Sequence, residues 1–315
     1  MHRESARKMK IICLDSSGLT ASVAILEDDQ LVAEYNVTYK KTHSQTLLPM
    51  LDELKKMIDL DLATVDAIAI AKGPGSFTGL RIGSATAKGL SQALDKPIVE
   101  IGTLEGMACN LYGSSDIICP IMDARRQQVY TGVFMYESAL CDNAFAEGSA
   151  ELCGDAVAEG SAKLCGDAVA SDSAESCINT VESGSAKSCI NTVESGSAKY
   201  SEYRLKTLLP DSAMSIEELI TKVSEIADEQ NRNIVFLGDG VPVFKEAILE
   251  ALKDRCSFAP AHMNRQRAAA FGYLALERFA AGEVVSCYEH APEYLRLSQA
   301  ERERNEGIRN KGSNY

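Results

Sequence analysis

Four glycines within eleven residues mark the stretch of this chain whose composition most suggests chemistry. Residues 73–83 read Gly-Pro-Gly-Ser-Phe-Thr-Gly-Leu-Arg-Ile-Gly and lie between an apolar run and a helix-like stretch. Glycine is costly unless the backbone needs a positive φ or a very close approach. A strand, a glycine turn and a helix start can together cradle an anion or another backbone segment. The stretch lacks the Lys-Ser/Thr of a Walker loop and the ribose-binding acid of a dinucleotide fingerprint, so a generic phosphate loop is disfavoured.

Two apolar runs, residues 10–15 and 117–123, each end in an aspartate and are predicted strands. In the actin, Hsp70 and sugar-kinase superfamily, hairpins that follow such aspartates grip the phosphates of ATP, and the aspartate holds Mg²⁺ through water. The Gly-Asp-Gly of residues 238–240 lies where that superfamily supports the adenine. This resemblance predicts nucleotide contacts at Asp15, Ser16, Asp123, Gly238 and Gly240. The second hairpin departs from the pattern because Ala124 stands where glycine is usual, and three ordinary turns are the alternative interpretation.

Neither a catalytic residue nor a metal-ligand set is predicted. The four histidines, His2, His43, His262 and His290, do not occur in a zincin pattern. Ser76 is followed by Phe77, so no Gly-x-Ser-x-Gly elbow is present. The ten cysteines form no Cys-x-x-Cys pair, which disfavours structural zinc and favours reduced thiols.

Length and charge narrow the class of protein further. The 315 residues are enough for two domains, and the formal net charge of −13 disfavours a stand-alone nucleic-acid binder. No apolar run approaches the roughly 20 residues that span a bilayer, and we expect no membrane association. A cytoplasmic location is expected because no signal-type apolar region follows the charged start.

A twelve-residue repeat interrupts the chain at about 138–200. Residues 146–157 recur almost unchanged as 158–169, and Ser-Cys-Ile-Asn-Thr-Val occurs at 176–181 and 188–193. Such a period could form short hairpins or coils of a small β-solenoid. Because serine, glycine, alanine and acidic residues dominate, a low-complexity insertion in a surface loop is the favoured interpretation.

Outside this insertion, a pattern of hairpin, strand, helix and strand occurs twice. Helices are predicted at 42–58, 81–94, 215–229, 243–252 and 267–281 from apolar residues at helical spacing. We therefore expect two similar α/β lobes with a cleft between them. The first lobe is expected at 9–104 and the second at 105–284, followed by a tail, 285–315, that returns towards the first lobe.

The chain resembles the TsaB (YeaZ) family of bacterial tRNA threonylcarbamoyladenosine biosynthesis proteins. The resemblance rests on Asp15-Ser16-Ser17, the glycine stretch 73–83, Asp123-Ala-Arg-Arg-Gln-Gln-Val-Tyr130 and Tyr294-Leu-Arg-Leu-Ser-Gln-Ala-Glu-Arg302. It covers roughly residues 9–137 and 200–304. The resemblance implies an α/β, two-lobed actin-like (RNase H-like) fold of mixed sheets flanked by helices.

The same resemblance implies a subunit that is not an enzyme on its own. The family is a degenerate paralogue of TsaD, which carries two metal-binding histidines in a His-x-Glu-Gly-His stretch. Here the matching stretch is Thr103-Leu-Glu-Gly-Met107, so both histidines are absent. Threonine is a poor metal ligand and methionine a soft one, which leaves no metal site.

The implied role is a scaffold and activator that forms a heterodimer with TsaD for threonylcarbamoyl transfer to adenosine 37 of tRNAs reading ANN codons. The ATPase TsaE would join a ternary complex, TsaC would supply threonylcarbamoyl-AMP, and tRNA would bind only through the complex. A homodimer would form when TsaD is absent. The implied partner interface comprises Leu47, Leu51, Leu54, Arg81, Ala85 and Lys88.

No cofactor is implied as required, although weak or interface-shared binding of ATP or ADP with Mg²⁺ is compatible with the family. The main alternative function is an ATP-dependent kinase or transferase that uses Asp15 and Asp123. A peptidase is a third alternative, which the missing nucleophile and metal ligands disfavour.

Overall fold

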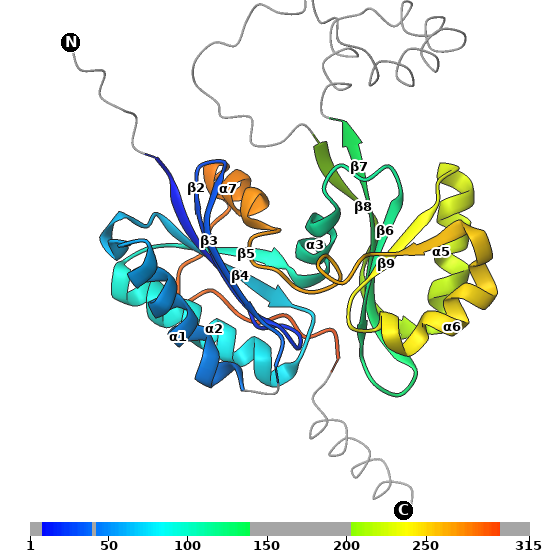
Figure 1. Cartoon of the computed structure of the whole chain (residues 1–315), viewed down its shortest axis with the longest axis horizontal. Helices are drawn as coiled ribbons and strands as arrows, with labels where there is room; N and C mark the ends of the chain where they lie inside the picture. The colour runs from blue at the N-terminus through cyan, green and yellow to red at the C-terminus, as the bar shows by residue number, and fades with distance from the viewer. Residues whose placement is uncertain (1–7, 40–41, 139–202, 297–315) are drawn as a thin grey trace, which may run out of the picture. The chain divides into compact units, whose positions relative to one another are not determined.

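The computed structural model describes residues 8–39, 42–138 and 203–296 (Figure 1). The repeats at 146–193, and the part of the family-like tail beyond residue 296, lie outside these ranges. None of the helices within them is long and apolar enough to cross a membrane.

The first sheet is mixed and has the strand order β3-β2-β1-β4-β5. Its strands are β1 (Lys10–Asp15), β2 (Ala21–Glu27), β3 (Gln30–Val37), β4 (Ala67–Gly73) and β5 (Ile98–Gly102). Strands β1 to β3 form an antiparallel meander, whereas β4 lies parallel to both β1 and β5. The predicted strands are therefore present, and each parallel connection contains a helix, as crossovers require.

Helices α1 (His43–Met57) and α2 (Phe77–Leu94) pack on one face of this sheet, and α7 (Gly272–Ala280) on the other (Figure 1). Alternate residues of β1 point to opposite faces, so Ile12 and Leu14 enter the core beneath α1. Burying such side chains completely stabilises the fold by about 1.5–3 kcal/mol each.

The second sheet repeats this arrangement with the order β10-β9-β6-β7-β8. Its strands are β6 (Ile117–Asp123), β7 (Gln128–Ser138), β8 (Tyr203–Ser215), β9 (Ile234–Leu237) and β10 (Cys256–Phe258). Helices α5 (Ile216–Gln230) and α6 (Val241–Leu252) cover one face, and α3 (Thr103–Ala108) packs on β6 from the other. In both sheets the first strand of the lobe is central, with its hairpin on one side and the later strands on the other. The predicted two α/β lobes of mixed sheet are confirmed.

The last helix corrects the predicted helix and lobe boundaries. α7 begins at Gly272 rather than at residue 267, and it packs on β1, β4 and β5 of the first sheet. Residues 272–280 therefore belong with the first lobe, although the sequence pattern assigned everything up to 284 to the second. The missing side chain of Gly272 allows α7 to pack this closely on the first sheet, because a Cβ at Gly272 would lie 2.2 Å from a side-chain carbon of Leu26 on β2.

Two further differences concern α2 and β8. Helix α2 begins four residues earlier than predicted, because the Ser76 hydroxyl accepts a hydrogen bond from the Gly79 amide, at 3.3 Å, and caps the helix. Strand β8 was not predicted, since it directly follows the repeats and its apolar residues do not alternate regularly.

The tail after α7 lies along the edge of the first sheet. Ile98 on β5 and Val285 form an antiparallel bridge through two backbone hydrogen bonds of 2.9 Å. Further on, the buried His290 ring contacts Glu100 through Nδ1 at 2.7 Å, and the Glu293 amide donates to the Lys72 carbonyl at 2.8 Å. The tail therefore covers the exposed edge of β5, which an unpaired strand would otherwise present.

Candidate functional site

The glycine stretch packs against the turn between β1 and β2. A Cβ at Gly75 would lie 2.3 Å from the Ser17 carbonyl oxygen, and one at Gly79 would lie 2.1 Å from that of Ser16. The Ser76 amide donates to the Ser17 carbonyl at 2.7 Å, and the Ser16 hydroxyl donates to the Gly79 carbonyl at 2.9 Å. These glycines therefore serve the approach of one backbone segment to another, which was one of the two roles the composition allowed.

Asp15 is enclosed by this contact. It is 2% exposed, and its Oδ1 accepts hydrogen bonds from the Ser17 amide at 2.8 Å and the Ser17 hydroxyl at 2.6 Å. Burial raises the pKa of Asp15 to about 6, and the Ser17 hydrogen bonds and the nearby His43 oppose the rise. The His43 Nε2–H donates to the Gly18 carbonyl at 2.9 Å, so the turn is held from the α1 side as well.

The second aspartate lies in a turn of unusual backbone conformation. Asp123 Oδ1 accepts from the Arg125 amide at 2.8 Å, while Arg125, Arg126 and Gln127 have φ values of 65°, 56° and 58°. Non-glycine residues adopt this left-handed region at some cost. The Asp123 amide donates to Asp239 Oδ1 at 3.3 Å, and burial raises the pKa of Asp239.

The two glycines at 238–240 also lie against backbone. A Cβ at Gly238, whose φ is 116°, would lie 2.0 Å from the Ile121 carbonyl oxygen, and the Gly240 amide donates to that oxygen at 3.0 Å. The turn between β9 and α6 is thereby fastened to β6. The structure thus brings Asp123, Gly238 and Gly240 together, and it places Asp15 and Ser16 beside the glycine stretch.

A segment that the sequence did not single out contacts both groups. The Asn264 side chain accepts a hydrogen bond from the Gly238 amide at 2.7 Å. Two residues later, Gln266 is 1% exposed. It lies so close to Gly18 that a Cβ added at Gly18 would be 2.3 Å from Gln266 Nε2. The Ala268 amide then donates to the Ser22 hydroxyl at 2.7 Å. Sequence reasoning missed these residues because their contacts are distant in the chain and they match no motif.

Three of the predicted interface residues require correction. Leu47, Leu51 and Leu54 are 1%, 5% and 5% exposed and pack in the core of the first lobe. Their side chains therefore serve the core and offer little surface to a partner. The exposed apolar residues of this helix are instead Leu48, at 51%, and Met57, at 74%.

The other three predicted interface residues lie on α2. Arg81 and Ala85 are exposed and Lys88 is half-buried. Ala85, Gly89 and Ala93 are spaced four residues apart, all exposed, and form what we call the small-residue ridge. A Cβ added at Gly89 would meet nothing within 4 Å. Unlike the glycines of the 73–83 stretch, Gly89 therefore has no neighbour among the described residues that requires a glycine.

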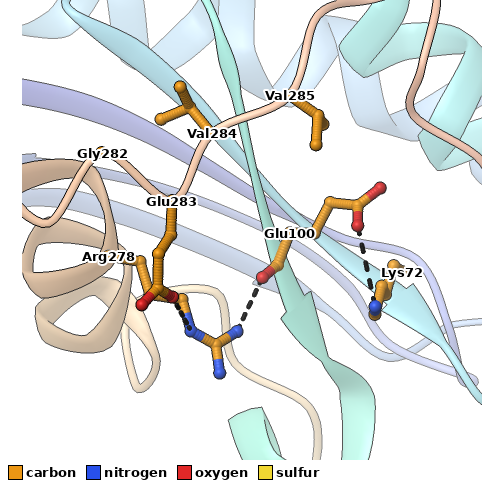
Figure 2. Close-up of a pocket in the computed structure, with 7 residues that line it drawn as sticks. All are labelled: Lys72, Glu100, Arg278, Gly282, Glu283, Val284 and Val285. Carbon is orange, nitrogen blue, oxygen red and sulfur yellow. Dashed lines mark hydrogen bonds and ion pairs between the residues drawn. The ribbon is translucent and has the colours of Figure 1, made fainter.

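A hollow of about 290 Å³ lies where the tail leaves α7, between β4, β5 and residues 282–285 (Figure 2). Its charged groups pair with one another. Lys72 Nζ lies 3.6 Å from Glu100 Oε2, and Arg278 donates to the Glu100 carbonyl at 2.7 Å (Figure 2). Arg278 also donates to Glu105 Oε1 at 2.7 Å. The contacts of Arg278 therefore fasten α7 to β5 and α3.

Several known proteins are similar to this chain in sequence. The sequence model described as "TsaD: tRNA N6-adenosine threonylcarbamoyltransferase" matches residues 31–152. The Bacillus subtilis protein named "tRNA threonylcarbamoyladenosine biosynthesis protein TsaB" is 27% identical over 93% of this chain and 96% of its own length. The Haemophilus influenzae protein of the same name is 34% identical over 43% of this chain and 58% of its own.

Over most of its length, the chain is similar to a TsaB protein.

Solved structures agree on the fold. The structure titled "YeaZ from Pseudomonas aeruginosa" covers 90% of this chain and all of its own, with a TM-score of 0.56 at 20% identity. A second structure, titled as an uncharacterized protein with similarity to peptidase YEAZ from the same organism, covers 91% with a TM-score of 0.59 at 21% identity. At this identity the likeness shows the fold alone, and it confirms the predicted two-lobed, actin-like class.

Thr103 and Met107, the positions that the sequence resemblance sets against the TsaD histidines, are part of the core. Thr103 is 0% and Met107 1% exposed, and Met107 packs among apolar residues of α3 and the second sheet. Gly106 between them would bring a Cβ to 3.0 Å from the Phe271 ring. Among the described residues, no three His, Cys, Asp or Glu side chains lie close enough to hold a metal ion.

Proposed function

We propose that this chain is the non-catalytic scaffold and activator subunit that forms a heterodimer with TsaD for threonylcarbamoyl transfer to adenosine 37 of tRNAs reading ANN codons. The names of its TsaB relatives support the pathway, and the match to the TsaD sequence model supports a partner of related fold. In this proposal TsaE joins as the ATPase, TsaC supplies threonylcarbamoyl-AMP, tRNA binds only through the complex, and a homodimer forms when TsaD is absent. We place the complex in the cytoplasm.

The observation that carries this proposal is a glycine, Gly89, on the exposed face of α2. A glycine there destabilises the helix by roughly 0.5–1 kcal/mol relative to alanine. Among the described residues nothing uses the space, because none of their atoms lies within 4 Å of an added Cβ. A helix of another chain that packs closely on the small-residue ridge would use it.

The neighbouring surface of α1 supports the same face. Leu48 is 51% and Met57 74% exposed, so α1, which packs against α2, also presents apolar side chains to solvent. Contacts over both helices can bury the roughly 1,200–2,000 Å² typical of stable interfaces.

Two buried residues of α3 support the absence of transfer chemistry in the lone subunit. Thr103 and Met107 are buried where TsaD carries its metal ligands, and neither side chain suits a hard or borderline ion. No cofactor is required in this proposal, although weak or shared binding of ATP or ADP with Mg²⁺ is compatible with it.

Calorimetry with purified TsaD tests the pairing. We expect the wild-type chain to bind and Ala85→Glu to abolish binding, because it places a charge on the small-residue ridge. Ala247→Glu is the matched control, since Ala247 is an exposed alanine within α6 of the second lobe. Equal binding by wild type and Ala85→Glu would refute the assigned face, and no binding by wild type would refute the heterodimer.

The alternative, an ATP-dependent kinase or transferase, predicts a different titration. Tight, Mg²⁺-dependent ATP binding to the lone chain, lost in Asp15→Ala, would support that alternative. Threonylcarbamoyl transfer to tRNA by the lone chain, with TsaD excluded, would contradict the non-catalytic role.

A further inference from the structure

Arg81 lies at the N-terminal end of the small-residue ridge, one helical turn before Ala85. Its guanidinium carbon sits 4.2 Å from the centre of the Phe77 ring, and its Nε donates to the Tyr294 hydroxyl at 3.3 Å. Phe77 and Tyr294 stack on each other with ring centres 4.2 Å apart. Two aromatic residues, one from the helix and one from the tail, therefore fix the orientation of this guanidinium.

The charge of Arg81 is not neutralised within the described ranges. Among those residues its contacts are the Phe77 ring and the Tyr294 hydroxyl, and no carboxylate lies within ion-pair distance. Its two terminal nitrogens remain available, and this pair matches the two oxygens of a carboxylate. Because the Arg81 guanidinium is already oriented, less entropy is lost when it binds a carboxylate.

The helix that carries Arg81 differs in charge from the rest of the chain. Residues 77–94 contain Arg81 and Lys88 and no acidic residue, whereas the whole chain has a net charge of −13. Opposite charges across an interface favour the correct partner and its orientation. The surface that continues from the ridge therefore suits an acidic group on the partner.

We propose that Arg81, oriented by Phe77 and Tyr294, binds an Asp or Glu carboxylate of the partner subunit at the N-terminal end of the small-residue ridge. The inference rests on the proposed heterodimer, and its occupant is a carboxylate of the TsaD chain. Arg81 makes the contact, and Tyr294 is a positioning residue that brings the tail into the interface.

Affinities for TsaD test the geometry of the site. We expect Arg81→Ala to weaken binding by roughly tenfold or more, as the loss of a charge-assisted bidentate pair does. Arg81→Lys keeps the charge without the fork and should be intermediate, and Tyr294→Phe, which removes only the hydroxyl, should weaken binding less. Arg255→Ala, which removes an exposed arginine of the second lobe, should leave the affinity unchanged.

Cross-linking identifies the occupant directly. A carbodiimide couples amines to carboxylates but leaves guanidinium groups unmodified, so Arg81→Lys in complex with TsaD should give a peptide linking position 81 to an Asp or Glu of TsaD. The wild-type complex is the control. A link from position 81 to Glu301, Glu303 or Glu306 of the same chain would overturn the proposal in favour of the tail.

Two other outcomes separate the failures. If wild type binds TsaD and Ala85→Glu does not, but Arg81→Ala binds as wild type, the carboxylate site is wrong and the heterodimer stands. If Arg81→Ala instead loses only tRNA binding by the complex, the occupant is a phosphate and the proposal is overturned. If wild type does not bind TsaD, both proposals fail.

Discussion

The motif residues of this chain serve close packing of backbone segments rather than reactive chemistry. Gly79 and Gly238 each lie where a Cβ would come within 2.1 Å of a carbonyl oxygen. Asp15, the residue most suggestive of metal chemistry, instead accepts two hydrogen bonds from Ser17 inside the fold. Nucleotide contact at these positions stays a prediction, and any ligand there would have to reach a carboxylate that is 2% exposed.

Asp15 should make stability depend on pH. Its pKa is raised to about 6, so the folded state holds this proton more tightly than the unfolded state does. As the pH rises from about 4 to about 6, the unfolded state releases the proton first and the folded state loses stability. Asp15→Asn keeps an acceptor for Ser17 and never ionises, so we expect it to be more stable than wild type by about 1–3 kcal/mol at pH 7, with no difference below about pH 4.

Urea unfolding between pH 4 and pH 7 measures this difference. Asp254→Asn is the matched control for the substitution, because Asp254 is exposed. Parallel curves for wild type and Asp15→Asn over this interval would show that the carboxyl does not titrate as its burial implies.

At the scale of elements, α2 has two faces with different purposes. Its inner face includes Gly79, Leu80 and Gly83, which pack against the β1–β2 turn and the sheet. Its outer face carries the small-residue ridge and Arg81. The helix therefore both fastens the first hairpin and presents the proposed interface.

Two glycine-to-alanine changes within α2 separate these purposes. Gly89→Ala should stabilise the free chain by about 0.5–1 kcal/mol, since the added methyl meets nothing and alanine favours the helix. Gly79→Ala should destabilise it by more than about 1 kcal/mol, because its Cβ would press on the Ser16 carbonyl. Thermal unfolding of both variants measures the contrast.

Gly89→Ala should have an unfavourable effect on the affinity for TsaD, in contrast to its stabilising effect on the free chain. If a helix of TsaD packs closely on the ridge, the variant that stabilises the free chain should bind TsaD more weakly than wild type does. Unchanged affinity would mean that the space at Gly89 is not used in the complex.

For the whole molecule, the duplicated topology explains where the chain can tolerate a long insertion. Residues 139–202 connect β7 to β8, which are neighbours in the second sheet. The equivalent connection in the first sheet, between β2 and β3, needs only Asp28 and Asp29. A short connection therefore suffices to join two neighbouring strands at this position of the topology.

Replacing residues 141–200 by a short Gly/Ser linker should leave the fold intact. We expect the midpoint of thermal unfolding to change by no more than about 2 °C, because the described residues supply a core cluster in each lobe. Calorimetry with TsaD should give the wild-type affinity, since α1 and α2 belong to the other lobe. A shortened chain that fails to fold would assign a structural role to the repeats.

The sequence by itself indicated most of the strands, the duplicated α/β pattern and the resemblance to TsaB proteins, because apolar periodicity and short motifs are local properties of the chain. Tertiary structure decided what local patterns leave open. Helix α1 has apolar residues on more than one face, so only packing shows that Leu51 is buried and Leu48 exposed. A glycine-rich turn can cradle an anion or admit a backbone, and the approach of Ser16 and Ser17 selects the second. The contact between Arg81 and Tyr294 joins residues 213 positions apart, a relation that only the folded chain brings about.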